Sequence, residues 1–523
     1  MLPAQLVRGS TFWTLVFLLA FIAVLWHTAV AWATNTSDPR DSTVRGPATV
    51  LERDPDGNTT VTRLASGDLR NQITSRLGLH VTAEELSVWR DRWEGGVTGD
   101  SFLNARISEE KSRITNNKNS FMSNPGGHLW NFGSVPTNSS GCIDREFSVS
   151  TQRVQSARMR DAAFYGLVTR DAAVLDEVKD TLLRQPEQSN VDWSRNPWCP
   201  SAQSMIDAAV PGFSVSHVTL VSLFTYDYLQ IAVKEGLISD FTTGQNATLE
   251  QWYLDFADYL MPSATFKMGL ITEDWENGGT TLTTWALDPN RLWHTANTYQ
   301  GGPQVHSAHN LFNNRRASTV RYVAVAGVKF RDENLTLWSK RWLGDFIRYH
   351  VYPHGAVGDM HRGWNHSNAS LGYPILATSH TLTAVDTIAR AGDTSLYELS
   401  TTDGLHDSAG GPHHGDLPGK SYEFLMQTMT RYSDGTFTRY NSNGELYSFD
   451  NNNRGYHDRL IVGNLYYQDP KVQDFYRGNN GMHPWRQTGN GTTDLNDSWA
   501  YPSPYLMTAG LEGQIWPYPA TVE

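Results

Sequence analysis

The sequence predicts a mainly helical protein, most simply an α/α toroid of helical hairpins with long loops and a few short β-strands. Apolar residues recur at three- and four-residue steps, which is the helical period. Loops rich in Gly, Pro, Asn and Trp separate these periodic segments. The predicted helical segments are 151–185, 215–235, 248–260, 306–328, 334–350, 376–392 and 419–432.

Strand signals are few and short. The clearest are Thr436–Tyr440 and Glu445–Phe449, joined by a turn at Asn443-Gly444. Pro211 and Gly212 precede the predicted helix that starts near residue 215. Repeated helix, loop and helix favour hairpins around an axis, with a groove at one end that is walled by the loops.

The composition narrows the class of protein. The chain has 523 residues, with 42 Lys and Arg against 54 Asp and Glu, so its formal net charge is −12. A general nucleic-acid binder presents basic surfaces, so this charge argues against one. The 18 Trp, 22 Tyr and 20 Phe can fill a core or line a cleft for ring-shaped ligands such as sugars.

The N-terminus carries an export signal. Arg8 supplies the positive region, Phe12–Val30 is almost wholly apolar, and Ala31-Trp32-Ala33 fits a cleavage site. We expect cleavage after Ala33 and a secreted, extracellular protein; the alternative is an uncleaved anchor, since the run is long enough to span a bilayer. Residues 34–69 are polar and predict a flexible linker, and 70–523 predict a single catalytic domain.

Sequons and cysteines agree with export. Two cysteines, Cys142 and Cys199, are expected to pair in an oxidising compartment, which stabilises the fold by about 4 kcal/mol; the alternative is an activated thiol. Nine Asn-x-Ser/Thr sequons occur, at Asn35, Asn58, Asn138, Asn246, Asn334, Asn365, Asn368, Asn490 and Asn496. Glycosylation is expected at the seven that lie in the catalytic domain.

The densest polar stretch in a predicted helix runs from His306 to Arg316. On a helix, His306, His309, Asn310 and Asn313 share one face, and Asn314, Arg315 and Arg316 follow them. Amides, guanidinium groups and imidazoles together suit an anionic ligand, because the first two bind carboxylates and His moves protons. The alternative is a helix terminus whose polar groups only cap neighbouring loops.

A second cluster lies in a Gly-rich stretch between two predicted helices. It contains Tyr352, Asp359, His361, Arg362 and Tyr373. An Arg beside a Tyr lowers the pKa of the phenol, which lets the Tyr take and return a proton. The alternative is that these side chains only pack or form hydrogen bonds.

Weaker candidates point to other chemistry. Glu273, Asp274 and Glu276 are paired carboxylates of the kind a glycosidase needs. His413, His414 and Asp416, or His306 with His309, have ligand types for a metal, but no HExxH occurs, and we expect neither a metal nor another cofactor. Tryptophans in loop-like stretches predict sugar-stacking platforms: Trp193, Trp198, Trp275, Trp285, Trp293 and Trp364.

Several of these motifs together resemble a known family. The run Asn310–Arg316 before an Ala/Val helix is similar to the Asn-Asn motif of toroidal alginate and glucuronan lyases. Asp359–Arg362, Leu371-Gly372-Tyr373 and the helix that ends at Ala389–Glu398 resemble a later part of the same family, and the helix after Cys142 is also similar. The resemblance covers about residues 100–450 and rests on order and spacing.

The resemblance implies β-elimination on a uronic-acid polysaccharide. Asn314 and Arg315 would neutralise the C5 carboxylate with support from Arg362, and Tyr373 would be the acid and also a candidate base. His309 or His361 is the alternative base, and Tyr352 is a rival for the Tyr role. Asn313, Arg316, His306, Tyr352, Trp193 and Trp364 would bind substrate. Several family members have His directly after the Asn pair, where this chain has Arg315.

The sequence is also compatible with two other functions. One is a glycoside hydrolase on the same fold, with Glu273, Asp274 or Asp359 as acid and base. The other is a non-catalytic glycoprotein that binds carbohydrate through a Trp-rich cleft. The expected partner is an acidic polysaccharide, with no nucleic acid and with a membrane only if the N-terminal segment stays uncleaved.

Overall fold

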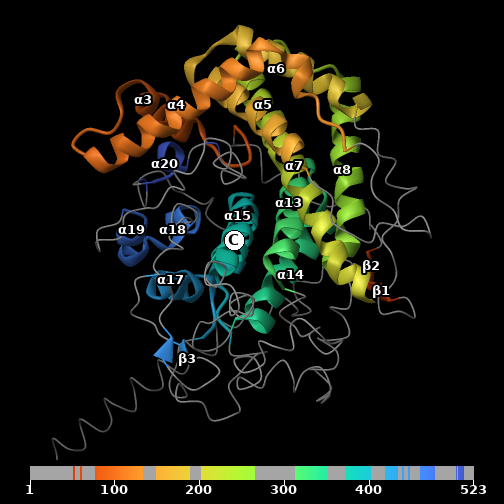
Figure 1. Cartoon of the computed structure of the whole chain (residues 1–523), viewed down its shortest axis with the longest axis vertical. Helices are drawn as coiled ribbons and strands as arrows, with labels where there is room; N and C mark the ends of the chain where they lie inside the picture. The colour runs from red at the N-terminus through yellow and green to blue at the C-terminus, as the bar shows by residue number, and fades with distance from the viewer. Residues whose placement is uncertain are drawn as a thin grey trace, which may run out of the picture.

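A computed structural model describes slightly more than half of the chain, and it is mainly helical there (Figure 1). The described residues are 51–53, 59–61, 77–132, 149–188, 202–265, 312–351, 372–401, 419–433, 439–440, 446–447, 460–477, 502, 504–509 and 511. The predicted signal sequence, most of the predicted linker and both cysteines lie outside them.

The described helices and strands follow one another in this order: β1 (Leu51–Arg53), β2 (Thr59–Val61), α3 (Ala83–Gly95), α4 (Ser101–Ser123), a 3₁₀ turn η2 (Pro125–His128), α5 (Ser150–Thr169), α6 (Ala172–Gln188), α7 (Ala202–Lys234), α8 (Thr243–Thr265), α13 (Asn314–Phe330), α14 (Glu333–His350), α15 (Gly372–Arg390), α16 (Ser395–Glu398), α17 (Tyr422–Ser433), β3 (Arg439–Tyr440), β4 (Leu446–Tyr447), α18 (Ile461–Tyr467), α19 (Pro470–Arg477) and α20 (Pro504–Met507).

Helices α5 and α7 lie side by side and run in the same direction. The Arg153 guanidinium, near the start of α5, lies 5.6 Å from the centroid of the Phe213 ring, in the first half of α7. Phe164 and Tyr228, near the other end of each helix, are 5.6 Å apart between ring centroids. The order of contacts is therefore the same along both helices, as parallel packing requires.

Helix α13 continues this row beside α7. The hydroxyls of Ser216 and Ser318 are 3.0 Å apart near the start of α13, and Lys329 forms an ion pair with Asp227 near its end. The backbone of α13 is almost completely enclosed, because only Arg315, Lys329 and Phe330 of its residues are not buried. A helix covered on nearly all sides needs neighbours on each of them.

Helix α15 is the fourth member of the row and is parallel to α7. The rings of His217 and His380 are 5.4 Å apart between centroids, in the first half of α15. At the other end, consecutive residues bridge the two helices: the Leu79 N–H donates to Asp227 on α7, and the His80 ring contacts Asp386 on α15. We call α5, α7, α13 and α15 the parallel row.

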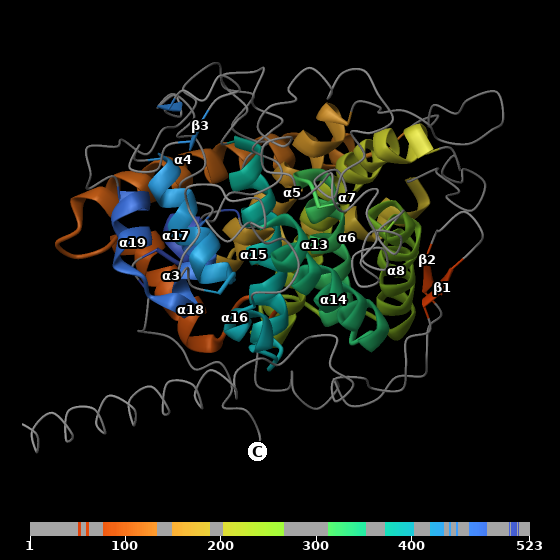
Figure 2. The same ribbon diagram turned by 90° about the horizontal axis from the view of Figure 1, so that it is seen from below.

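Helices α6, α8 and α14 return in the opposite direction and pack against the row (Figure 2). For α8, the Tyr226 hydroxyl donates to Asn246 near the start of α8, whereas Ser222 contacts Tyr253 one to two turns later. The chain therefore alternates between a helix of the parallel row and an antiparallel helix that covers it. This is the hairpin pattern that the sequence predicts.

Connections of very different length join the hairpins. The connections that leave the C-terminal end of a row helix are 170–171, 235–242, 331–332 and 391–394. The connections that enter the N-terminal end of the next row helix are 189–201, 266–313 and 351–371. Arg170 and Arg331 end α5 and α13 in the left-handed conformation, at φ 61° and 58°, so the chain turns at once. Of these connections, the long ones enter the N-terminal end of the row, and long loops are where functional residues concentrate.

Three sequence predictions of helix limits were wrong. Segment 151–185 is two helices, because the chain turns at Arg170 and Leu175 then packs closely against Gly166. Helix α7 starts at Ala202 and passes through Pro211 and Gly212 rather than starting after them. The helix predicted from residue 306 starts at Asn314, so Asn313 is not on its face. The other predicted helical segments correspond to α8, α14, α15 and α17.

Two small antiparallel ladders accompany the helices. Arg439–Tyr440 pairs with Leu446–Tyr447, which confirms the predicted hairpin. Leu51–Arg53 pairs with Thr59–Val61 inside the segment predicted as a linker, and β2 lies beside α8 in both views (Figures 1 and 2). In the part of the chain that the structure describes, no helix combines the length and apolarity that a membrane span needs.

Candidate functional site

The N-terminal end of the parallel row is a region of positive side chains. The described segments 150–160, 211–222, 314–321 and 372–382 contain no Asp or Glu. Their basic residues are Arg153, Arg158, Arg160, His217, Arg315, Arg316, Arg321 and His380. Asp207, in the earlier turns of α7, is an acid nearby in sequence, and its side chain lies outside the described set.

The start of α13 is fixed by Asn313. Its side-chain oxygen accepts hydrogen bonds at 3.1 Å from the backbone N–H groups of Arg315 and Arg316. Such a cap satisfies two of the donors that a helix start leaves open. Asn313 therefore sets where the helix begins, which is the capping role that the sequence left open, and its oxygen is already engaged within the chain.

Asn314, Arg315 and Arg316 occupy the first turn of α13. Asn314 and Arg316 are buried, with exposed fractions of 2% and 1%, whereas Arg315 is partly exposed. Burial lowers the pKa of the Arg316 guanidinium to about 9, which still leaves it positively charged at neutral pH. Arg315 thus has the accessible guanidinium of the pair, and Arg316 places a second positive charge inside the protein.

His217 lies one turn further along the row, between α7 and α13. Its Nδ1 is 2.6 Å from the Phe213 carbonyl oxygen, and its Nε2 is 3.4 Å from the Ser318 hydroxyl. The Phe213 ring meets the imidazole edge to face at 4.2 Å between centroids. His380 on α15 contacts the same imidazole. The two histidines and Ser318 thus join three helices of the row at one level.

Sequence reasoning missed His217 and His380 as site candidates. Each stands inside an apolar helical segment, where a lone His is ordinarily a core residue. His217 and Ser318 are 101 positions apart in the chain, so no local pattern shows their contact. A sequence signal did exist: both histidines fall in the first half of a predicted helix whose acids come only later, at Asp227 and Asp386.

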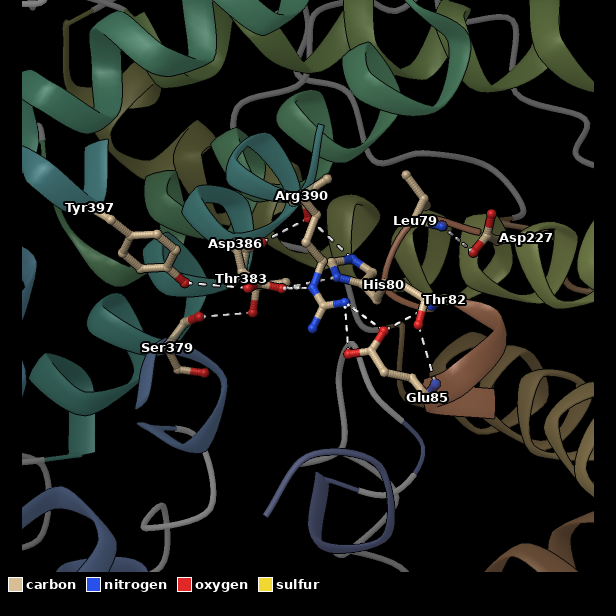
Figure 3. A network of polar contacts seen from close by, with 11 residues as sticks. Leu79, His80, Thr82, Glu85, Asp227, Ser379, Thr383, Asp386, Arg390 and Tyr397 are labelled. Carbon is tan, nitrogen blue, oxygen red and sulfur yellow. Dashed lines mark hydrogen bonds and ion pairs between the residues drawn. The ribbon is translucent and has the colours of Figure 1, made fainter. Parts of the chain in front are cut away.

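The C-terminal end of the row holds a second polar centre, shown in Figure 3. Arg390 donates to Asp386 at 2.9 Å and to both oxygens of Glu85, at 3.0 and 3.1 Å. His80 contacts Asp386 at 3.3 Å and the Thr387 hydroxyl at 3.1 Å. Burial lowers the pKa of the His80 imidazole, although the Asp386 carboxylate acts in the opposite direction.

This second centre fastens residues 77–85 across the ends of the row helices. Asp227 accepts from the Leu79 N–H at 2.9 Å and pairs with Lys329, so α7, α13 and the Leu79 segment meet there. Thr82 caps α3 through a reciprocal bond with Glu85. Each acid of this centre faces a cation in the chain itself, which is the arrangement of a structural anchor.

Of the remaining predicted site residues, one lies in a described helix and the others lie outside the described residues. Tyr373 is the second residue of α15, at the N-terminal end of the row, and only its backbone is described. The others lie outside the described residues: His306, His309, His361, Arg362, Tyr352, Trp193 and Trp364. So do the acids at 273, 274, 276 and 359, the pair His413-His414, and Cys142 and Cys199.

Two predicted glycosylation sites lie on described helices. Asn246 is partly exposed on α8, and its side-chain oxygen accepts from Tyr226 at 2.6 Å. Asn334, in the first turn of α14, has an exposed fraction of 7%. Such a buried side chain is a poor site for a glycan on the folded chain. The other five, Asn138, Asn365, Asn368, Asn490 and Asn496, lie outside the described part of the chain.

Among the described residues, no group of three or more His, Cys, Asp or Glu side chains is placed to hold a metal ion. Comparisons with family models, with curated proteins and with solved structures give no match to this chain. The functional argument therefore depends on the residues at the N-terminal end of the row.

Proposed function

We propose that this protein is a polysaccharide lyase that cleaves a uronic-acid polymer, of alginate or glucuronan type, by β-elimination on an α/α toroid. The observation that carries the proposal is the charge of the N-terminal end of the parallel row. The N-terminal halves of four parallel helices come together there with arginines, histidines and the Asn314 amide, and without an acid in the segments described above. Such an end favours a polyanion.

The chemistry follows from what a uronate needs. Its C5 proton is removable only when the adjacent carboxylate is neutralised, so that charge developing on that group is stabilised. Asn314 and Arg315 stand together in the first turn of α13 and supply an amide and a guanidinium, with Arg362 in support. Arg316 adds a buried positive charge beneath them.

Two proton transfers complete the reaction. A base takes the C5 proton, the C5 electrons form a C4–C5 double bond, and the bond from C4 to the glycosidic oxygen breaks. Tyr373 protonates that oxygen, so one sugar chain leaves as an alcohol and the other carries the double bond. The candidates for the base are Tyr373, His309 and His361. Support for Tyr373 comes from its position in the first turn of α15, at the same end of the row as Asn314.

The proposed polymer substrate lies outside the cytosol, which agrees with the predicted export signal. We propose that residues 1–33 direct secretion, that Cys142 and Cys199 form a disulfide outside the cytosol, and that the polymer is met there. No step of the proposed reaction requires a cofactor.

The proposal is tested with secreted protein and a panel of polyuronates: alginate blocks, glucuronan, hyaluronan and heparan-type chains. Ultraviolet absorbance follows the conjugated double bond, and a parallel assay counts reducing ends. We expect both signals to rise with one substrate and to be lost in Tyr373→Phe. Reducing ends without absorbance would instead identify a hydrolase, and binding without new ends a carbohydrate-binding protein.

A further inference from the structure

The Ser318 hydroxyl connects α13 to α7 just below the first turn of α13. It lies 3.0 Å from the Ser216 hydroxyl and 3.4 Å from Nε2 of His217. All three side chains are buried. The two contacts join a helix that carries proposed substrate-binding groups to a neighbouring helix that carries none of the predicted ones.

His217 is held firmly enough to serve as the fixed half of this contact. A carbonyl oxygen only accepts, so the 2.6 Å contact to Phe213 requires Nδ1 to donate. That bond leaves Nε2 directed at Ser318. The rings of Phe213 and His380 contact the imidazole from α7 itself and from α15. Rotation of the ring would break the Phe213 hydrogen bond.

Asn314 and Ser318 lie four residues apart on α13. Residues at this spacing share one face of a helix and are separated by about one turn, roughly 5.4 Å along the axis. The contact at Ser318 therefore helps to hold the rotation of α13 one turn below Asn314. The Asn313 cap determines where the helix begins. Together they fix both the start and the rotation of the turn that holds Asn314 and Arg315.

We propose that the Ser318–His217 contact is a positioning element for Asn314: it keeps the amide directed at the substrate carboxylate without touching the substrate. This inference rests on the proposed function. It assigns to Ser318 and His217 a role in turnover beyond that of ordinary core residues. Positional errors of about 1 Å are enough to cost an enzyme roughly 10²-fold in rate.

The chain supplies a matched control for Ser318. Ser222 is also a buried serine on the row, and its hydroxyl contacts the Tyr253 hydroxyl at 2.9 Å. That contact joins α7 to α8 instead of α13. Ser222→Ala therefore removes a buried serine hydroxyl of the same kind and leaves the start of α13 as it is.

The experiment compares Ser318→Ala with Ser222→Ala in the full secreted chain. We expect Tm to fall in both variants, and by more in Ser318→Ala, because Ser318 loses its contacts to Ser216 and His217 whereas Ser222 loses one contact. We expect kcat to fall by about 10-fold or more in Ser318→Ala with a smaller change in KM, and to stay within about twofold in Ser222→Ala. Hydrogen exchange at the backbone amides of residues 314–318 should rise only in Ser318→Ala.

A second pair of variants tests the other partner. His217→Leu should reproduce the loss of kcat, whereas His217→Gln, whose amide reaches the position of Nε2, should restore part of it. Equal kcat in Ser318→Ala and Ser222→Ala would overturn the positioning role while leaving the lyase proposal intact. If the wild type cleaves no polyuronate, the proposed function fails. The hydrogen-exchange measurement still tests the contact in that case: unchanged exchange at residues 314–318 in Ser318→Ala would show that Ser318 does not hold the start of α13.

Discussion

The two ends of the parallel row are built from the same four helices and differ in charge balance. At the C-terminal end, Asp227, Asp386 and Glu85 each bind a cation of the chain, at Lys329 or Arg390. At the N-terminal end, the described segments carry arginines and histidines without an acid. Arg160, the last residue of its segment, forms an ion pair with the next residue of α5, Asp161. The connections are short at the first end and long at the second.

This difference separates a structural anchor from the proposed site. A balanced, buried network fixes the fold, since removal of one partner leaves an uncompensated charge. A concentration of side-chain charges of one sign stabilises the fold less and favours a ligand of the opposite sign. Substitutions of the same kind at the two ends should therefore have opposite consequences.

The largest expected effect is at the C-terminal end. Arg390→Met leaves Asp386 and Glu85 buried without their guanidinium, and we expect the free energy of unfolding to fall by about 3–5 kcal/mol. Urea denaturation measures it. Arg184→Met, at an exposed position of α6, is the control and should change stability by less than about 0.5 kcal/mol. A loss below about 1 kcal/mol in Arg390→Met would remove the distinction between the ends.

The same substitution at the N-terminal end should act in the other direction. Burial holds the pKa of Arg316 below its ordinary value, so the folded state carries this charge at a cost. Arg316→Met should leave the free energy of unfolding unchanged or raise it by about 1–2 kcal/mol, while polyuronate cleavage falls. Urea denaturation and the absorbance assay measure the two quantities. Destabilisation as large as that of Arg390→Met would identify Arg316 as a second anchor.

A smaller effect concerns pH. The folded-state pKa of His80 is below its ordinary value of 6.5 because of burial, so below about pH 6.5 the unfolded chain binds more protons than the folded one. Stability should therefore decrease as pH falls from this value toward the folded pKa, by at most about 1.4 kcal/mol per pH unit from this group. Burial also lowers the pKa of His128, which adds to the slope.

The contribution of His80 is isolated with His80→Gln. Urea denaturation across about pH 5 to 8 should give a shallower decrease in the variant than in the wild type. Identical slopes in the two proteins would show that His80 does not titrate within the anchor as described.

The smallest expected effect comes from Thr387→Val. The Thr387 hydroxyl contacts His80 and donates to the Thr383 carbonyl at 2.8 Å, so its loss should cost about 1 kcal/mol. Turnover per folded molecule should stay within about twofold of the wild type, because this change is confined to the anchor. A large decrease in turnover would show that the two ends are coupled through α15.

The sequence predicts the helices well where one face is apolar and predicts their limits poorly. The break at Arg170 was missed because a left-handed turn usually has Gly, and the continuation of α7 through Pro211 was missed because Pro usually ends a helix. Asn313 was assigned to a helical face, whereas its side chain caps the helix.

Residues of the candidate site were predictable only where they are close in sequence. Asn314, Arg315 and Arg316 stand in one motif, so their type and order indicate anion binding. His217 meets Ser318 across 101 positions, and His80 meets Asp386 across 306. Contacts of this kind depend on how the hairpins pack, which no local pattern contains.

The central claim is that the N-terminal end of the parallel row carries out β-elimination on a polyuronate. The most direct test records ultraviolet absorbance over time, with the polymer that the wild type cleaves, for Asn314→Ala and Thr387→Val at equal concentrations of folded protein. The account predicts a rate about 10²–10³-fold lower in Asn314→Ala and near the wild-type value in Thr387→Val. Wild-type absorbance kinetics in Asn314→Ala would contradict it.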